Sequence, residues 1–200
     1  NKEAVFQYFK KVKPDAIIHC AAYTAVDKAE DDKDTCHLVN VDGTKNLAEV
    51  AKEINAKFMY ISTDYVFNGE GEKPFKETDE PSPIGQYGRT KLDGEQVVKQ
   101  LLDNWFIVRI SWVFGINGNN FVKTMLKLAN ERQSIKVVND QIGSPTYTVD
   151  LANFITQLVS TQKYGIYHAT NTGSCSWYEF AKEIFKLSGK NVHVEPCTTD

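Results

Sequence analysis

The sequence predicts an α/β protein built on a doubly wound, parallel β-sheet, and two observations support this fold class. Short apolar segments at residues 16–20, 57–61 and 106–110 lack the polar–apolar alternation of a strand with one face in water. The longer segments between them carry apolar residues at helical spacing. Buried strands that alternate with helices are typical of a parallel sheet covered by helices on both faces.

The composition is that of a soluble globular chain. Of the 200 residues, 42% are hydrophobic and 24% are charged, which suits one domain or one domain with a small appendage. The formal net charge of −3 argues against nucleic acid as the main partner. No apolar run approaches the ~20 residues of a membrane span. The four cysteines have no C-x-x-C spacing, which argues against a metal site or a disulfide framework and fits a reducing cytoplasm.

The first segment predicts a helix that Asn1 can cap and that stops before Pro14. A dinucleotide-binding fold usually begins instead with a strand and a glycine-rich turn that cradles the pyrophosphate, and no G-x-x-G-x-x-G occurs in this chain. We therefore expect the N-terminal βαβ start to be missing from it. The chain stops at Asp200 without a natural terminus, so we expect its C-terminal end to be missing as well.

The strand at residues 16–20 leads into Ala21 and Ala22, at the edge where open α/β sheets hold their ligands. Small side chains there would let a cofactor lie against the backbone, and the alternative is a tight strand-to-helix turn. The charge cluster at residues 27–34 predicts solvated surface and the start of a helix. Apolar positions from residue 38 to residue 54 then predict one long helix.

The residues best suited to chemistry follow the second strand. Residues 57–61 run into hydroxyls and a carboxylate that include Thr63, and after a loop Tyr87 and Lys91 lie four residues apart on one helical face. A phenol titrates near ~10, and a neighbouring ammonium favours the phenolate and lowers that pKa. Tyr87 would then be a usable acid, with Thr63 bonded to the same substrate oxygen. The alternative is a solvated helix face.

Later segments complete the alternating pattern. The strand at residues 106–110 ends beside Trp112, which could stack on a sugar or fill a core. Asn120 and Lys123 begin the next helix, a natural anion site that suits a pyrophosphate, with plain helix capping as the alternative. The remaining elements are a strand at 135–138, a helix at 149–160, a strand at 165–169, and a helix that opens with a capping box at residues 176–179.

A series of ordered motifs resembles the extended short-chain dehydrogenase/reductases over nearly the whole chain. These motifs are Ala21-Ala22-Tyr23-Thr24-Ala25-Val26-Asp27-x-Ala-Glu30, Ser62-Thr63-Asp64-Tyr65-Val66-Phe67, Glu77-Thr78-Asp79, Tyr87-Gly-x-Thr-Lys-Leu-x-Gly-Glu95, Ser111-Trp112-Val113-Phe114, Gly118-Asn119-Asn120-Phe121 and Asn139-Asp140-Gln141-x-Gly143-x-Pro145-Thr146. Within this family the sequence is most similar to the reductases of 4-keto nucleotide sugars.

The resemblance implies a Rossmann-type, dinucleotide-binding core over residues 1–113 and 130–169. It implies a small substrate-binding lobe to which residues 114–129 and 170–200 contribute. The implied reaction is reduction of the 4-keto group of dTDP-4-dehydro-L-rhamnose to dTDP-L-rhamnose by NADPH or NADH, for surface polysaccharide biosynthesis. Hydride would come from the nicotinamide and the proton from Tyr87.

The resemblance also assigns roles to single residues. Lys91 would lower the Tyr87 pKa and hold the nicotinamide ribose, and Thr63 would orient the carbonyl oxygen. Asn40 would support the strand that carries Thr63 or contact the cofactor region. The residues assigned to the cofactor are Ala21, Ala22, Thr24, Asn40, Tyr87 and Lys91. The residues assigned to the substrate are Thr63, Asp64, Tyr65, Trp112, Asn120 and Lys123.

Other functions of the same fold remain to be distinguished. Nucleotide-sugar dehydratases carry an Asp-Glu pair after the Thr, whereas this chain has Asp64-Tyr65 and so lacks the base for elimination. An epimerase would share Tyr87 and Lys91, and a regulatory subunit would keep the fold and bind partners without turnover. The choice between NADPH and NADH, a metal at an interface and the oligomeric state stay open, with a homodimer as one option.

Overall fold

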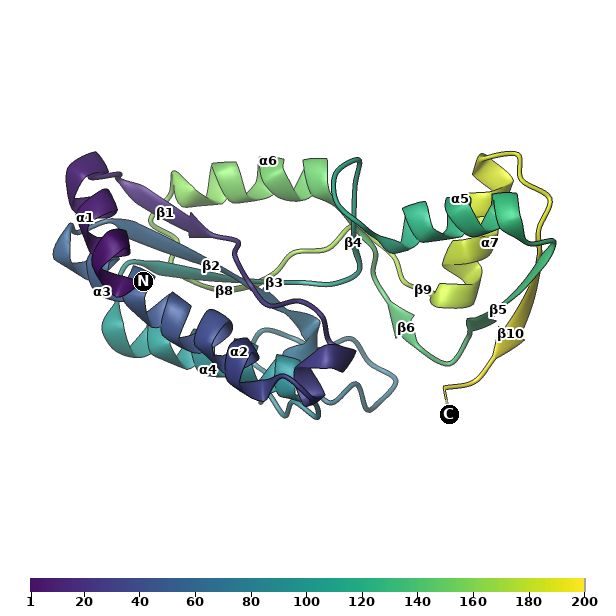
Figure 1. The fold of residues 1–200 in the computed structure, drawn as a ribbon, viewed down its shortest axis with the longest axis horizontal. Coiled ribbons are helices and arrows are strands. Elements are labelled where there is room, and N and C mark those ends of the chain that lie inside the picture. The colour runs from purple at the N-terminus through teal and green to yellow at the C-terminus, as the bar shows by residue number, and fades with distance from the viewer. Residues whose placement is uncertain (200) are drawn as a thin grey trace. The chain divides into compact units, whose positions relative to one another are not determined.

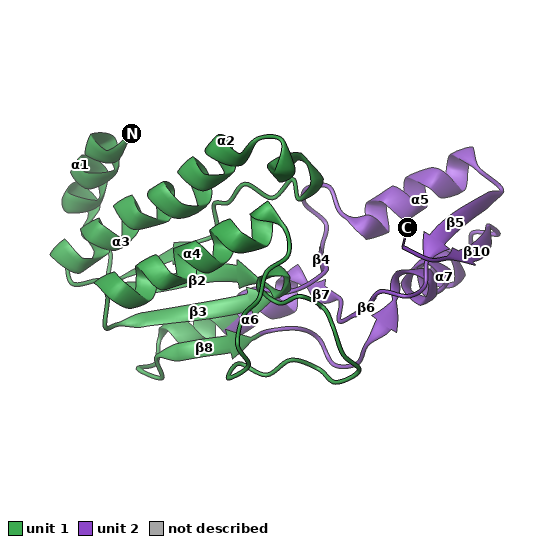
Figure 2. Cartoon of the chain, turned by 90° about the horizontal axis from the view of Figure 1, so that it is seen from below, with its two compact units in different colours: residues 1–110, 155–168 green, residues 111–154, 169–200 purple. Residues whose placement is uncertain are grey.

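The computed structural model describes residues 1–199, and Asp200 lies outside the described residues. The chain divides into two compact units, coloured separately in Figure 2. Unit 1 comprises residues 1–110 and 155–168, and unit 2 comprises residues 111–154 and 169–200. The expected dinucleotide-binding core included residues 111–113, 130–154 and 169, which fall in unit 2.

Unit 1 is organised around a parallel, four-stranded sheet in the order β1-β2-β3-β8 (Figure 1). Its strands are β1 (Ala16–His19), β2 (Lys57–Thr63), β3 (Trp105–Ile110) and β8 (Gly165–His168). Ile17 pairs with Phe58, and Phe106 pairs with Met59 on one side and Gly165 on the other. The sheet confirms the predicted parallel α/β fold, and it brings the carboxyl ends of all four strands to one edge.

Helices cover both faces of this sheet. Helices α3 (Gly43–Glu53) and α4 (Gln86–Leu101) lie on one face and α6 (Thr148–Val159) on the other (Figure 1). The core of unit 1 lies mainly between the sheet and α3 and α4 and includes Ile17, Ala48, Ala51, Phe58, Tyr60, Val98 and Ile107. At the start of β2, the Lys57 Nζ donates hydrogen bonds to the carbonyl oxygens of Val159 (3.1 Å) and Thr161 (2.7 Å), where α6 ends.

The N-terminal elements follow the sequence with one difference. Helix α1 (Lys2–Val12) begins at Asn1, whose side chain accepts a hydrogen bond from the Ala4 amide at 3.3 Å. The long helix predicted for residues 38–54 begins instead as a π-helical turn, η2 (Leu38–Asp42), which separates α2 (Lys33–His37) from α3. A short 3₁₀ turn, η1 (Asp27–Glu30), precedes them.

Unit 2 has its own core between two helices and a parallel strand pair. Helices α5 (Phe121–Glu131) and α7 (Trp177–Leu187) pack with β5 (Ser134–Val138) and β10 (His193–Cys197). The core comprises Met125, Ile135, Val137, Ala181, Ile184 and Phe185. Two short strand pairs complete the unit, namely β4 (Val113–Phe114) with β7 (Thr146–Tyr147) and β6 (Ile142–Gly143) with β9 (Cys175–Ser176).

The capping box predicted for α7 is confirmed. The Glu179 amide donates to the Ser176 Oγ at 3.1 Å, and the Ser176 amide donates to the Glu179 Oε2 at 2.8 Å. Within residues 1–199, none of the helices is both long and apolar enough to cross a membrane. The same residues contain no group of three or more His, Cys, Asp or Glu side chains placed to hold a metal ion.

Candidate active site

The site begins where β2 ends, at the carboxyl edge of the sheet. Thr63 is buried there and caps the 3₁₀ turn η3 (Asp64–Val66), because its Oγ1 accepts from the Tyr65 amide at 3.3 Å. The same hydroxyl donates to the Asp64 Oδ1 at 3.1 Å. The chain therefore turns sharply at the strand end and presents Thr63, Asp64 and Tyr65 in sequence.

Helix α4 carries Tyr87 and Lys91 on one face, as their spacing predicts. The Thr63 side chain lies close enough to the Tyr87 phenol to lower its pKa, so the structure brings these two predicted residues together. The Lys91 side chain is buried, donates from Nζ to the Ile61 carbonyl oxygen at 2.7 Å, and lies 4.0 Å from the centre of the Tyr60 ring. The Lys91 ammonium therefore lies next to the end of β2, the strand that carries Thr63.

Burial sets the protonation of this cluster. It raises the pKa of Tyr87 to about 12, although the nearby Thr63 hydroxyl acts in the opposite direction. It lowers the pKa of Lys91 to about 7, against the charge of Glu95, which raises it. The sequence had predicted a lowered Tyr87 pKa, and this direction is wrong because desolvation of the phenol outweighs any neighbouring ammonium. Tyr87 is therefore a protonated phenol at neutral pH.

Asp64 and Tyr65 adjoin the phenol. Burial raises the pKa of the Asp64 carboxyl to about 6, and its hydrogen bond with Thr63 lowers it by less. The Tyr65 ring is half-exposed and meets the Tyr87 ring edge to face, with centroids 5.6 Å apart. The predicted residues Thr63, Asp64, Tyr65, Tyr87 and Lys91 thus form one cluster in unit 1.

The residues predicted to meet the cofactor follow β1 at the same edge. Ala21 and Thr24 are exposed and Ala22 is half-buried. Asn40 differs, since it is 1% exposed and its amide is bonded inside the protein. Its Oδ1 accepts from the Tyr23 amide at 2.8 Å and its Nδ2 donates to the Thr90 Oγ1 at 3.0 Å. Asn40 therefore ties the segment after β1 to α4.

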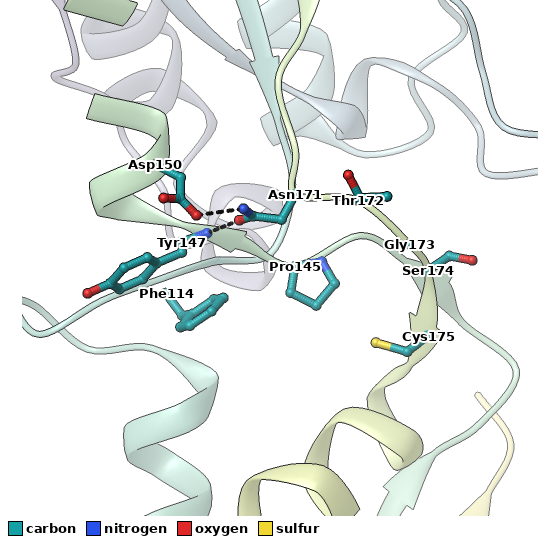
Figure 3. A pocket seen from close by; sticks show the side chains of 9 residues that line it. All are labelled: Phe114, Pro145, Tyr147, Asp150, Asn171, Thr172, Gly173, Ser174 and Cys175. Carbon is teal, nitrogen blue, oxygen red and sulfur yellow. Dashed lines mark hydrogen bonds between the residues drawn. The ribbon is translucent and has the colours of Figure 1, made fainter. Parts of the chain in front are cut away.

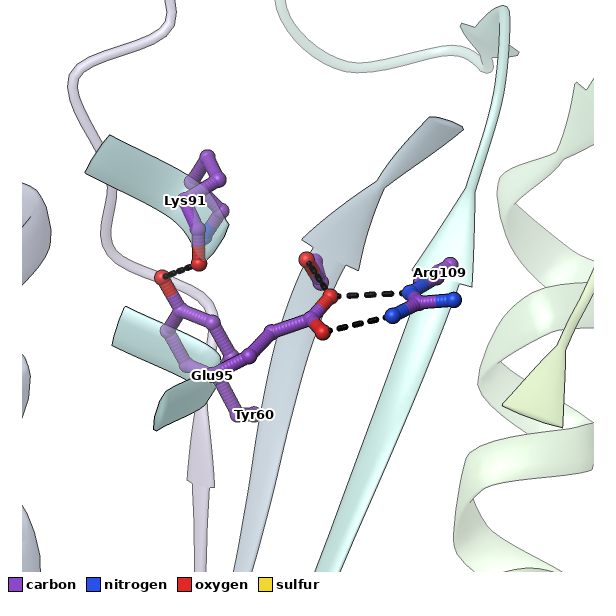
Figure 4. A network of polar contacts seen from close by, with 5 residues as sticks. Tyr60, Lys91, Glu95 and Arg109 are labelled. Carbon is purple, nitrogen blue, oxygen red and sulfur yellow. Dashed lines mark hydrogen bonds and ion pairs between the residues drawn. The ribbon is translucent and has the colours of Figure 1, made fainter. Parts of the chain in front are cut away.

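A buried ion pair joins α4 to β3, and sequence reasoning did not identify it. Arg109 donates to Glu95 through two bonds, Nε to Oε1 at 2.9 Å and Nη2 to Oε2 at 2.7 Å, and the Ser62 Oγ donates to Oε1 at 2.6 Å (Figure 4). A signal was present, because an Arg inside an apolar strand requires a counter-charge. Glu95, one turn beyond Lys91 on the same helix, supplies it.

The other predicted substrate residues belong to unit 2. Asn120 caps α5, accepting from the Lys123 amide at 3.1 Å and donating to the Gly115 carbonyl at 2.8 Å. The Lys123 Nζ donates to the Gly118 carbonyl at 2.9 Å. These hydrogen bonds are those of helix capping, the alternative that the sequence left open beside an anion site. Trp112 has a left-handed backbone (φ 47°), and its ring stacks on Trp177 with centroids 3.5 Å apart.

Unit 2 also contains an open cavity of about 560 Å³ (Figure 3). Its polar anchor is Asn171, whose Nδ2 donates to the Asp150 Oδ2 at 2.7 Å and whose Oδ1 accepts from the Tyr147 amide at 2.7 Å. The lining consists of Phe114, Pro145, Tyr147, Asp150 and residues 171–175. None of the predicted site residues lines it, so we do not assign the reaction to this cavity.

Comparison with known proteins identifies the family. The family model described as the RmlD substrate binding domain matches residues 1–200. The chain is 44% identical over 200 residues to a Bacillus subtilis spore coat polysaccharide biosynthesis protein, SpsK. The match covers 100% of this chain and 70% of that protein. It is 39% identical over 195 residues to the dTDP-4-dehydrorhamnose reductase of Escherichia coli. This match covers 95% of this chain and 65% of that protein.

Solved structures agree with this assignment. A crystal structure of dTDP-4-dehydrorhamnose reductase from Bacillus anthracis in complex with NADP matches with a TM-score of 0.98 and 50% identity, over 100% of this chain and 71% of that chain. The UDP-glucose 4-epimerase of Brucella ovis shares the fold alone, with a TM-score of 0.85 at 20% identity over 100% of this chain and 70% of that chain. The chain belongs to the RmlD substrate binding domain family, within the extended short-chain dehydrogenase/reductases that its ordered motifs predicted.

Proposed function

We propose that the protein containing this chain reduces the 4-keto group of dTDP-4-dehydro-L-rhamnose to dTDP-L-rhamnose at the expense of NADPH or NADH. The observation that carries the proposal is the Tyr87 phenol, which is protonated at neutral pH, close to Thr63, and four residues from Lys91 on one helical face. Reduction of a ketone needs a proton donor for the oxygen as well as a hydride for the carbon. Tyr87 meets the first requirement.

The residues present fit a nicotinamide cofactor at one end. Ala21, Ala22 and Thr24 leave accessible backbone at the carboxyl edge of β1, and Tyr87 and Lys91 lie on a neighbouring element at that edge. These residues would hold the nicotinamide and its ribose. When bound, the reduced nicotinamide supplies the hydride.

The chain's own groups move the proton. Tyr87 donates its phenolic proton to the substrate oxygen as negative charge develops there. The Thr63 hydroxyl, which donates to Asp64 in the absence of substrate, turns to donate a hydrogen bond to the same oxygen. The phenolate that remains is stabilised by the Lys91 ammonium, which is held in place by the Ile61 carbonyl. A proton from solvent then restores the phenol. Atoms and charge balance, because the ketone gains one hydride and one proton.

A second substrate has specific support among the relatives. The chain is 41% identical over 190 residues to the dTDP-4-keto-6-deoxy-D-glucose reductase of Streptomyces niveus. The match covers 94% of this chain and 66% of that protein. Both sugars present a 4-keto group to the same acid, so the cluster of unit 1 would serve either reaction. The two sugars must therefore be compared directly.

The test follows loss of NADPH absorbance with each keto sugar and the natural polypeptide that contains these residues. We expect turnover, and we expect Tyr87→Phe to lower the rate by ~10²–10⁴ while NADPH still binds. Tyr8→Phe is the matched control, because it removes one exposed hydroxyl from α1 and should leave the rate unchanged. Near-wild-type rates in Tyr87→Phe would remove Tyr87 from the mechanism.

Three other outcomes would point elsewhere. Sugar isomerisation without net NADPH consumption would favour an epimerase. NADPH binding without turnover of either sugar would favour a regulatory subunit. Light scattering of the same preparation would test the homodimer, which, like the cytoplasmic location, stays a prediction.

A further inference from the structure

The N-terminus of helix α4 lacks a side-chain cap of its own. The residue at the cap position is Gly85, with extended backbone (φ −95°, ψ 165°) and no side-chain hydrogen bond. Tyr87 is the second residue of the helix. The first amides of a helix have no partner within it, and an uncapped first turn frays easily. The acid of the proposed reaction therefore lies in the part of α4 that needs outside support.

That support comes from a carboxylate distant in sequence. The Glu30 Oε1 accepts a hydrogen bond from the Gln86 amide at 2.6 Å. A Cβ atom built on Gly85 would lie 2.9 Å from the same oxygen, so the carboxylate occupies the space of the missing cap side chain. A negative charge at a helix N-terminus is also favoured by the helix dipole.

The position of Glu30 is itself well defined. It is the last residue of η1, and its neighbour Ala29 is fully buried, with an amide that donates to the Ala25 carbonyl at 2.9 Å. The nearby Asp32 has a different role, because its Oδ2 accepts from the Tyr23 hydroxyl at 3.2 Å. A carboxylate on a packed turn can hold the end of α4 in one place.

We propose that Glu30 is a positioning residue for Tyr87. Its carboxylate caps helix α4 from a distant part of the same chain. The inference rests on the proposed reductase function. It adds that the motif running from Ala21 to Glu30 has a second task besides contacting cofactor, namely to anchor the acid-bearing helix. Loss of this cap lets the first turn of α4 open, and the fraction of molecules with Tyr87 in place falls.

The kinetic test compares Glu30→Ala with Asp31→Ala, which removes the same charge from the adjacent exposed position. Loss of a cap changes a helix end by a factor of about 5–30 in population, so kcat should fall by about that factor in Glu30→Ala. The KM for the sugar and the affinity for NADPH should change by no more than about twofold, because a positioning residue acts through Tyr87 and not through ligand binding. Asp31→Ala should keep the wild-type kcat.

A rescue variant separates capping from other roles of Glu30. Serine at position 85 would provide a cap within the chain, and its extended backbone suits one. Glu30→Ala vacates the space that its side chain needs. The double variant Glu30→Ala/Gly85→Ser should therefore recover kcat to within about twofold of wild type. Glu30→Gln, which keeps an acceptor oxygen, should lie between wild type and Glu30→Ala.

Amide hydrogen exchange gives a readout that does not depend on turnover. Exchange at the Gln86 amide, which bonds Glu30, should accelerate by about 5–30-fold in Glu30→Ala and slow again in the double variant, whose new cap holds the same first turn. Unchanged exchange in Glu30→Ala, or a loss of kcat that serine at position 85 fails to rescue, would overturn the inference. An inactive wild-type protein whose exchange still responds would instead reject the proposed function and leave the cap standing.

Discussion

At the scale of single residues, the carboxyl of Asp64 lies in an environment that disfavours its charge. It lies beside the Thr63 hydroxyl at the end of β2, and burial raises its pKa from 3.8 to about 6. The folded protein therefore holds the proton more tightly than the unfolded chain does. Between these two pKa values folding takes up protons, so the free energy of unfolding decreases as the pH rises through this window.

We predict that Asp64→Asn stabilises the protein increasingly as the pH rises. Asparagine keeps an acceptor for Thr63 and cannot ionise, so it avoids the cost of a buried carboxylate above about pH 6. Melting curves without ligands, taken between about pH 4 and about pH 8, should show a difference in Tm between variant and wild type that grows with pH. Asp103→Asn, at an exposed position, is the control. A pH-independent difference would contradict the assigned shift.

The chemistry-bearing residues could be identified from sequence, whereas their protonation could not. The spacing of Tyr87 and Lys91 fixes their common helical face, and that prediction is confirmed. The direction of the Tyr87 pKa shift depends on how much water the folded chain removes from the phenol, which no local pattern reports. Glu95 and Arg109 were missed for a related reason, since their pairing depends on contact between α4 and β3.

At the scale of elements, helix α4 approaches its neighbours through glycines. A Cβ atom on Gly88 would lie 2.1 Å from the Tyr65 carbonyl oxygen, and one on Gly94 would lie 2.3 Å from the Tyr60 hydroxyl. Real Cβ atoms do not make contacts this short, so the helix could not lie where it does with larger side chains. The two glycines therefore set the distance between the acid on α4 and the residues at the end of β2.

We predict that Gly88→Ala lowers kcat by ~10²-fold, because a displacement of about 1 Å at the reacting groups has an effect of this size. The steric conflict is with backbone, so a side-chain rearrangement cannot relieve it. Gly43→Ala is the matched control, since its Cβ would lie 3.6 Å from the nearest other atom, an ordinary contact. Steady-state rates of both variants decide the matter, and equal rates would show that α4 can shift without harm.

Two of the departures from the sequence prediction have a clear physical reason. Apolar spacing predicted one helix from residue 38 to residue 54, but it cannot reveal the π-helical turn η2, within which Asn40 makes its buried bonds to Tyr23 and Thr90. Strand β10 was not predicted, and it contains Pro196, a residue type that is unfavourable inside a strand. It forms nonetheless as the partner of β5, where pairing across unit 2 outweighs local preference.

At the scale of the whole molecule, the fold class followed from the sequence and the division into units did not. Buried strands without alternation reveal a parallel sheet directly. The assignment of residues 130–154 depends instead on the pairing of β5 with β10, whose partners Ser134 and His193 are far apart in the chain. Long-range pairing of this kind leaves no local signal.

We predict that these 200 residues by themselves bind NADPH more weakly than the micromolar range. The chain has candidates for the nicotinamide end of the cofactor, but it contains no G-x-x-G-x-x-G turn to bring a pyrophosphate to a helix N-terminus. Calorimetric titration of the 200-residue chain with NADPH is the measurement. Micromolar affinity in a monodisperse sample would contradict both this prediction and our placement of the cofactor.

The sheet of unit 1 depends on residues that are synthesised late. Lys57 forms two hydrogen bonds to the end of α6, and β3 pairs with β8. The ribosome produces the N-terminal strands first, at about 5–20 residues per second. All of residues 111–154 must emerge before β8 can reach its place, so β3 remains an open edge for on the order of several seconds. An unpaired edge invites pairing with other nascent chains. The sheet of unit 1 gains β8 only when His168 has left the ribosome, long after Ile110 has done so.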